Sequence, residues 1–485
     1  MSWQLERPIP ALPSSYFWTW DHCTNHVLDD PGNQTFGCYN RYLKRPETFV
    51  EDYRRLTDLA ASLGVKGIVI WGFLRDAHGG VEFAKRVAEY AASRGVAIMP
   101  GVGTTHYGGV YYEGDHPYCI ETFLRKNPDA YMINEDGSPR PGSACAGHPA
   151  FREWMAEGLA WLFREFAIGG MNLENGDLMV CHCPRCREHK AAWPVNDPDF
   201  FRLQAMSYVP ALQTLTGKLA DNLITWATYT GFLPDGVMAN MSPGEFQLAS
   251  MYCQRPAIFD RAPEQSIAQW TLTGMVRHAQ WTVRQQDGAD ASLRPLPLLA
   301  YLDDGAPAAA LDIPQWPKGL SPPSGTRHVG FMHQGNQCTM DRYEPVVSSI
   351  KEGCLRAYRA GLEGVSIHGE VTPRHTPWAL NYLAFSHFIH WPEDSLREFG
   401  RKTLGRVMDS EEEGEAYIEL LAHLESGPLT EAQRKDMINR TRLATDKVYR
   451  PDGQAVEHVM SRWRLWDWLY VMDQGPIRRH VINTY

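Results

Sequence analysis

No apolar run in the 485-residue sequence approaches the roughly 20 residues that a membrane-spanning helix needs. Basic residues are in the minority, since 47 Lys and Arg stand against 57 Asp and Glu, and the formal charge is −10 at pH 7. We therefore expect no nucleic-acid partner and no membrane partner, because both favour a basic face. The start MSWQLERPIPALPSS lacks the basic and apolar regions of a signal peptide, which predicts a cytoplasmic protein.

Two further patterns are missing. The early apolar segment GIVIWGFLRDAHGG lacks the GxGxxG spacing of a dinucleotide site, so we expect no organic cofactor and disfavour a doubly wound open sheet. The ten cysteines show no disulfide framework, because three of them fall within six positions.

One pattern recurs along the chain: an amphipathic helix is followed by a glycine and then by a short apolar strand. In TFVEDYRRLTDLAASLG the apolar residues follow helical spacing and Gly64 stands where a helix C-cap belongs, before the strand VKGIVIWGF. Alternating helices and buried strands indicate parallel βαβ units, and eight of them predict an α/β protein with a (β/α)8 TIM barrel. The strands are expected near 15–22, 65–73, 96–103, 168–174, 222–229, 265–272, 327–333 and 364–370.

The pattern changes after the eighth strand. From Pro392 onward the segments have helical spacing and no buried-strand signal, so we expect a barrel over residues 1–392 and a helical C-terminal extension over residues 393–485. Two long segments, 104–147 and 273–326, are rich in Gly and Pro, and they predict functional loops around the mouth of the barrel.

In such barrels the site lies at the carboxyl ends of the strands. The polar and aromatic residues there are rich in carboxylates, histidines and tryptophans and poor in Lys and Arg, which favours a neutral, polyhydroxylated ligand over a phosphate. With 16 Trp and 21 Tyr in the chain, we expect an oligosaccharide or glycoside substrate. The predicted substrate-binding residues are Asp21, His22, Asp76, His106, Asn172, Asp177, Trp226, Trp270, His333, Gln334 and His368.

Two glutamates end buried-strand patterns, Glu174 in GGMNLENGD and Glu370 in VSIHGEVTP. Glycosidic hydrolysis needs one carboxyl group to protonate the leaving oxygen and a second to act as nucleophile or base, so this pair is the predicted catalytic pair. Asp177 and Asp21 are the reserves. Because strands four and eight lie on opposite sides of a barrel, a wide carboxyl separation and inversion are favoured.

Three alternatives remain. The motif HCTNH on the first strand resembles the ligand pair of metal-dependent amidohydrolases, but three residues separate His22 from His26 where that pair needs one. A non-catalytic carbohydrate-binding barrel would lack paired carboxylates. A sugar-acid lyase or isomerase would need cations at the mouth to hold the substrate carboxylate, and the candidates are Arg75, Arg327 and Arg374.

The most specific local motif is CHCPRC, which contains Cys181, Cys183 and Cys186. Thiolates spaced C-x-C-x-x-C are able to converge on one tetrahedral ion, which predicts a zinc site. Cys145, upstream of the preceding helix, is the best fourth ligand, with His182 and His189 as alternatives. A site of three or four thiolates has no open position for substrate, so the ion is expected to be structural.

In the order of strand, glutamate and cysteines, residues 140–190 resemble the glycoside hydrolase family forty-two β-galactosidases. The resemblance implies that Glu174 is an acid/base and that Cys145 completes a zinc site with the three downstream cysteines. That family places Asn directly before the acid/base and its nucleophile on strand seven, whereas Asn172 lies two residues before Glu174 and Glu370 follows strand eight. The helix after Trp391 is similar to the extensions of hexosaminidase-like and α-glucuronidase-like barrels. A glycoside hydrolase barrel of an unassigned family is thus suspected, and homo-oligomerisation is compatible with the sequence.

Overall fold

The computed structural model describes ten segments of the chain: residues 9–21, 44–174, 181–191, 223–231, 266–271, 296–308, 327–333, 347–368, 378–449 and 457–474. Among them, no helix is both long enough and apolar enough to cross a bilayer.

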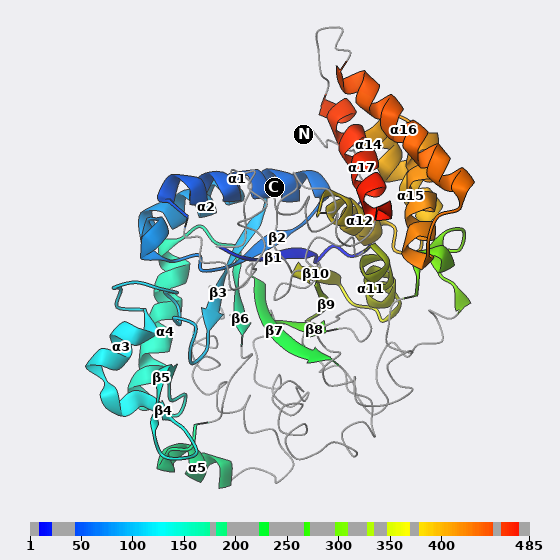
Figure 1. The fold of residues 1–485 in the computed structure, drawn as a ribbon. Helices are drawn as coiled ribbons and strands as arrows, with labels where there is room; N and C mark the ends of the chain where they lie inside the picture. The colour runs from blue at the N-terminus through cyan, green and yellow to red at the C-terminus, as the bar shows by residue number, and fades with distance from the viewer. Residues whose placement is uncertain are drawn as a thin grey trace.

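Parallel strands form a closed barrel in the order β1-β10-β9-β8-β7-β6-β3-β2, and β1 closes it by pairing with both β2 and β10 (Figure 1). The prediction of an α/β fold built on parallel strands is confirmed, and an observed strand lies within or close to each expected range. The strands are β1 (Tyr16–Trp20), β2 (Gly67–Trp71), β3 (Ala97–Gly103), β6 (Gly170–Glu174), β7 (Leu223–Gly231), β8 (Ser266–Thr271), β9 (Arg327–His333) and β10 (Gly364–His368).

The strands read as apolar runs because both faces of the barrel wall are buried. Residues alternate between the faces with a period of two. The outer face joins the large core beneath the helices and includes Phe17, Ile68 and Ile70. The inner face forms a separate core inside the barrel, whose buried members are Tyr16, Trp18, Trp20, Val69, Trp71, Met99, Ile267, Val329 and Phe331.

Helices cover the outside of the barrel (Figure 1). Helix α1 starts with Pro46 at its first turn and ends before Gly64, whose left-handed φ of 75° and N–H bonds to Ala60 and Ala61 make it the predicted C-cap. The other covering helices are α2 (Gly80–Ser93), α4 (Pro149–Glu165), α11 (Val347–Arg359) and α12 (Trp378–His390), and α1 spans Pro46–Leu63.

The expectation of a loop over residues 104–147 is wrong in part. This segment contains the helix α3 (Ile120–Lys126) and an antiparallel pair, β4 (Tyr131–Ile133) with β5 (Pro139–Ala144). The strands escaped notice because they are short and half-exposed, and β5, with the sequence PRPGSA, has no apolar alternation. In the second expected loop, the described residues 296–308 include the short 3-10 helix Leu298–Tyr301.

Helices follow α12 in the described C-terminal residues, as the sequence pattern predicts. They pack beside α11 and α12 at one side of the barrel (Figure 1). The first begins at a capping box between Ser395 and Glu398 and continues through a π-helical turn, Gly400–Leu404. The helices are α13 (Leu396–Phe399), α14 (Gly405–Met408), α15 (Glu411–Ser426), α16 (Glu431–Tyr449) and α17 (Glu457–Asp473).

Candidate functional site

Glu174 lies at the carboxyl end of β6, and β10, the strand that precedes Glu370 in the sequence, lies on the opposite side of the barrel. Glu174 is the last residue of β6 and pairs in register with Gly103 of β3 and Ala227 of β7. Glu370 follows β10 by two residues and lies outside the described residues, as do His22, Asp177 and Gln334. The backbones of Trp226, Trp270, His333 and His368 belong to strands, but their side chains, like that of Glu174, lie outside the described part.

Asn172 lies inside the barrel, two residues before Glu174 on the same strand, and is fully buried. Its side-chain oxygen accepts hydrogen bonds from the indole N–H groups of Trp18, at 3.2 Å, and Trp71, at 3.1 Å. Its amide nitrogen donates to Oε1 of Gln269 at 3.2 Å. The predicted polar residue therefore ties β1, β2, β6 and β8 together beneath the mouth.

Aromatic side chains line the inner face of the first two strands. The ring centroids of Trp18 and Trp71 are 5.9 Å apart, and Trp20 lies 5.4 Å from Trp71. Tyr107, in the loop after β3, packs edge-on against Trp20 and Trp71. This aromatic group was not predicted, although the period-two spacing of Trp18 and Trp20 in YFWTW was a signal for one face of a strand.

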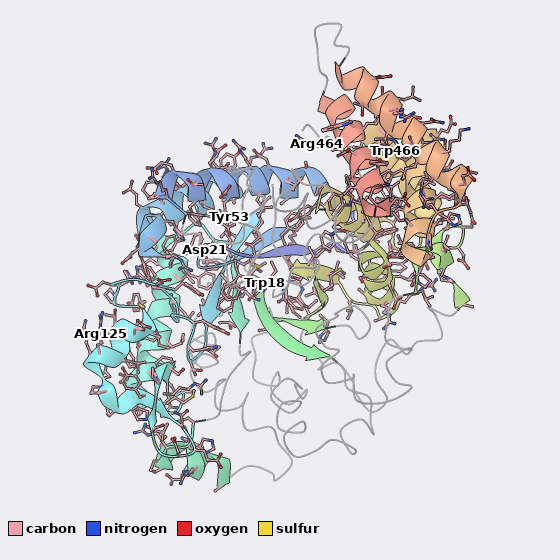
Figure 2. The ribbon with its side chains drawn as sticks, in the orientation of Figure 1. Trp18, Asp21, Tyr53, Arg125, Arg464 and Trp466 are labelled. Atoms are coloured by element: carbon pink, nitrogen blue, oxygen red, sulfur yellow. The ribbon has the colours of Figure 1, made fainter. Side chains whose placement is uncertain are left out.

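Asp21 was predicted to contact substrate, but in the structure its carboxylate contacts two side chains of the loop after β2. Its carboxylate is buried, with 1% of the residue exposed, and lies 3.0 Å from Nε of Arg75 and 3.4 Å from Nε2 of His78. Burial alone would lower the pKa of Arg75, but the carboxylates of Asp21 and Glu113 raise it. The carboxylate approaches Gly72 so closely that any Cβ there would lie 2.1 Å from Oδ1. Asp21 thus secures the loop after β2. Figure 2 labels it directly after β1.

Asp76 and His106 flank the next loop. Asp76 is exposed and accepts hydrogen bonds from the hydroxyl of Tyr111 and from the N–H of Asp115, the latter at 2.8 Å. This carboxylate organises the loop that follows His106. The imidazole of His106 is buried at the end of β3, with its centroid 3.7 Å from the ring of Tyr107.

The strand register gives the backbone positions of Trp226 and Trp270, the two tryptophans predicted to stack on a sugar. Trp226 pairs with Leu173, which belongs to the core between the strands and the helices. Trp270 follows Gln269 by one residue, and Gln269 bonds to Asn172 inside the barrel. Both tryptophans occupy register positions that alternate with those of the inner residues, so the backbone register does not favour their predicted role.

The cations expected in a lyase or isomerase site are already paired where they are described. Arg75 contacts Asp21 and Glu113. Arg327 begins β9, at the end of the barrel opposite the mouth, and its guanidinium contacts Glu363 at 2.6 Å. Arg374 lies outside the described residues.

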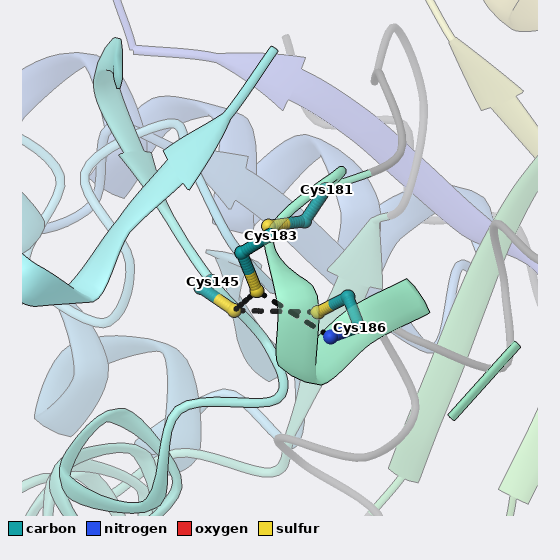
Figure 3. A group of neighbouring side chains, drawn as sticks. All are labelled: Cys145, Cys181, Cys183 and Cys186. Carbon is teal, nitrogen blue, oxygen red and sulfur yellow. Dashed lines mark hydrogen bonds between the residues drawn. The ribbon is translucent and has the colours of Figure 1, made fainter. Parts of the chain in front are cut away.

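Four cysteines converge from two segments (Figure 3). Cys145 directly follows β5, Cys181 and Cys183 lie just before helix α5 (Pro184–Ala191), and Cys186 lies in its first turn. Their sulfur atoms all lie within 4.8 Å of one another, and that of Cys145 is 3.4 Å from Cys186 and 3.7 Å from Cys183. The predicted four-cysteine set is brought together, and neither His182 nor His189 belongs to it.

The geometry fits a tetrahedral metal ion. Zinc–thiolate bonds of about 2.3 Å place the four sulfurs of a tetrahedron about 3.8 Å apart, close to the distances found. Hydrogen bonds from Cys145 and Cys186, and then from the N–H of Ile133, lower the pKa of the Cys181 thiol. A Cβ at Gly147 would lie 3.1 Å from the sulfur of Cys186, so glycine leaves the backbone close to the cluster. A bound cation would stabilise the thiolate forms.

Comparison with known proteins assigns no family. No family model and no curated protein matches the chain. A GH138 enzyme targeting pectin rhamnogalacturonan II is 9% identical over 96% of this chain, with a TM-score of 0.45, and the chain spans 57% of its length. A noncanonic maltogenic alpha-amylase from Thermotoga neapolitana is 10% identical over 78% of this chain and 77% of its own, with a TM-score of 0.41. A beta-N-acetylhexosaminidase from Bacteroides fragilis is 14% identical over 78% of this chain and 66% of its own, with a TM-score of 0.39.

Proposed function

We propose that the protein is a glycoside hydrolase and that Glu174 is its general acid. The observation that carries the proposal is the hydrogen-bonded position of Asn172 inside the barrel. Residues two apart on a strand lie on one face, so Glu174 occupies the next inner position, at the carboxyl end where barrel sites form. Below it lie the buried indoles of Trp18 and Trp71. A carboxyl group above an apolar floor is partly desolvated, which favours the protonated form that an acid requires.

Glu370 is the proposed partner of Glu174. It follows His368 by two residues, and His368 pairs in register with Trp18 and His333. Three strands separate β10 from β6 in either direction around the barrel. A pair on opposite walls suits the wider carboxyl separation of about 6.5–9.5 Å, in which Glu370 activates a water and the anomeric configuration inverts. In this mechanism Glu174 gives its proton to the leaving oxygen.

The remaining predicted mouth residues are proposed to bind sugar hydroxyl groups. His106, His333 and His368 each follow or end a strand at the same edge of the barrel. In the sequence, Gln334 directly follows β9, and Asp177 comes three residues after the end of β6. Imidazole, amide and carboxylate groups all form hydrogen bonds with hydroxyl groups, so these residues suit an uncharged sugar.

We further propose that the four cysteines hold a structural zinc ion, as the resemblance to family forty-two implies. The ion would supply cross-linking rather than chemistry on the substrate, because four thiolates fill its coordination. It would join the end of β5 to helix α5, where His182 donates its backbone N–H to Ile133 of β4 at 2.8 Å. Residues 181–186, which follow Glu174 in the sequence, would thereby be anchored to β4 and β5.

The finer architecture is also a proposal. We infer that residues 1–392 form a complete (β/α)8 unit and that residues 393–485 form a helical extension packed on it. The closed order of the strands and the helices α13 to α17 support this division. Expression of residues 1–392 alone should test it, since a separate extension leaves a folded barrel, whereas a shared core does not.

A panel of aryl glycosides covering both anomers of the common pyranoses tests the function. We expect release of phenol from at least one of them, and proton NMR of the first sugar product should show the inverted anomer. Binding without turnover would instead support the carbohydrate-binding alternative. Complete inertness towards every glycoside, with no binding, would remove the proposal.

A further inference from the structure

Tyr107 has a backbone conformation that side chains rarely adopt. Its φ is +49°, and among the described residues only one other non-glycine residue, Asp409, has a positive φ. The left-handed region brings Cβ close to the following carbonyl oxygen, which disfavours a bulky residue. Glycine would fit without strain, and the next two residues, Gly108 and Gly109, are glycines with φ of +74° and +75°. Tyr107 therefore has a backbone conformation that is unfavourable for a residue with a side chain.

The surrounding loop imposes this conformation. The N–H of Gly109 bonds to the carbonyl of His106 at 3.1 Å, and the N–H of Gly103 bonds to the carbonyl of Gly109 at 3.3 Å. A Cβ at Gly108 would lie 1.8 Å from the carbonyl oxygen of Tyr112, so the chain folds back tightly. A strained residue that its neighbours over-determine is a feature of ligand-binding and switch segments.

The strain holds the phenol ring at one place. The centroid of the Tyr107 ring is 6.1 Å from that of Trp20 and 5.9 Å from that of Trp71, at interplanar angles of 83° and 78°. Tyr112 meets Trp20 in the same way, at 6.1 Å and 75°. Trp20 ends β1, Trp71 ends β2, and both tyrosines follow β3. Perpendicular aromatic rings, two of them half-buried tyrosines, thus meet at the mouth of the barrel.

We propose that Tyr107 is a specificity-determining residue, whose half-buried ring, held edge-on against the buried Trp20, provides the aromatic surface that receives a pyranose ring of the substrate. The inference rests on the proposed glycosidase function. A pyranose presents an apolar face of C–H groups and an equatorial rim of hydroxyls. Aromatic rings bury the face, and a corner of perpendicular rings fixes its orientation. The rigid loop holds the corner in place before the sugar arrives, which lowers the ordering entropy lost on binding.

Four substitutions at Tyr107 separate the effect of the aromatic ring on binding from the effect of the backbone strain. Tyr107→Phe keeps both, Tyr107→Leu keeps volume and strain without the flat ring, Tyr107→Ala keeps strain alone, and Tyr107→Gly removes both. Tyr118→Ala is the matched control, because that ring lies 5.1 Å from Trp161, away from the inner aromatic group. Each protein is titrated with 4-nitrophenyl α- and β-pyranosides of glucose, galactose, mannose and N-acetylglucosamine, with binding read by saturation-transfer NMR and turnover by nitrophenol release.

We expect Tyr107→Phe and the control to bind within about twofold of the wild type, whereas the Leu, Ala and Gly variants bind about fivefold or more weakly. In denaturant, Tyr107→Gly should have a folding constant about fivefold or more above that of Tyr107→Ala, because the left-handed strain is relieved. Unchanged binding by the Leu, Ala and Gly variants would overturn the inference while leaving a hydrolase intact. Binding without turnover by the wild type would overturn only the glycosidase proposal, and a wild type that binds none of the probes would overturn both.

Discussion

The indole nitrogen of Trp71 lies 3.1 Å from the side-chain oxygen of Asn172, although 101 residues separate them in the sequence. Trp18 donates to the same oxygen, so the orientation of the amide is fixed by two donors on one side and by Gln269 on the other. This network joins four strands across the interior of the barrel. The network holds Asn172 on the inner face of β6, and the next position on that face is Glu174.

Replacing Asn172 should destabilise the barrel. Asn172→Leu has a similar volume but removes the acceptor of two buried indole N–H groups, and each unsatisfied group costs about 1–3 kcal/mol. We expect the free energy of unfolding in urea to fall by roughly 2–5 kcal/mol. The control is the half-buried Asn134, whose side chain donates to the hydroxyl of Ser138 at 3.1 Å, and Asn134→Leu should cost about 1 kcal/mol. Equal losses at the two sites would show that the network has no special weight.

Asp21 should behave as a structural carboxylate. Asp21→Asn leaves the buried guanidinium of Arg75 without its buried carboxylate partner, and breaking such a pair costs about 3–5 kcal/mol. Asp115→Asn is the matched control, because its partner Arg125 and Asp115 itself are exposed and the loss should stay below about 1 kcal/mol. If Asp21→Asn instead keeps full stability and weakens only substrate binding, the sequence-based role was right.

The strands were predictable from the sequence because strands buried on both faces leave continuous apolar runs, as in GIVIW of β2. Which face each residue occupies was harder to read. Trp226 and Trp270 end apolar runs just as Trp20 does, and only the register distinguishes them, since that register depends on pairing between distant segments. The partner of Asp21 also escaped prediction, because Arg75 lies 54 positions away on the neighbouring strand's loop.

The cysteine cluster shows the opposite case. The spacing of Cys181, Cys183 and Cys186 is local and appears directly in the sequence. A tetrahedral site needs a fourth ligand, and Cys145, upstream of the preceding helix, was the best candidate; the structure brings all four together. The aromatic corner around Tyr107 had no comparable signal. A positive φ at a non-glycine residue depends on hydrogen bonds and close contacts of the folded loop, and the sequence HYGG predicts only a turn.

Zinc should be bound stoichiometrically. Protein purified without chelator should contain one zinc ion per chain by elemental analysis, and Cys183→Ala should lose it together with several kcal/mol of stability, of the order that structural zinc contributes. Cys354→Ala is the control, since Cys354 is buried in α11 and outside the cluster. A wild-type protein free of metal, with the same stability in the presence of a chelator, would disprove the site.

His387 should make stability depend on pH. The imidazole is fully buried, its Nδ1 lies 2.9 Å from the hydroxyl of Thr403, and desolvation lowers its pKa to about 4 although Asp394 raises it. The unfolded chain, with a pKa near 6.5, binds the proton more readily. This contribution is therefore present above pH 6.5 and is lost as the pH falls towards 4, by roughly 3 kcal/mol in total. Urea titrations at pH 4 to 7 should show a shallower pH dependence for His387→Phe; parallel curves would contradict the assignment.

Leaving-group dependence tests the central claim most directly. A general acid matters most when the departing oxygen is a poor leaving group, so Glu174→Gln should lower kcat/KM for an unactivated disaccharide by several orders of magnitude and for the matching 2,4-dinitrophenyl glycoside far less. Circular dichroism should show that the variant keeps its fold. If Glu174 is the general acid, the losses on the two substrates diverge in this way. Near-normal activity of Glu174→Gln on the disaccharide, or an equal loss on both substrates, would contradict it.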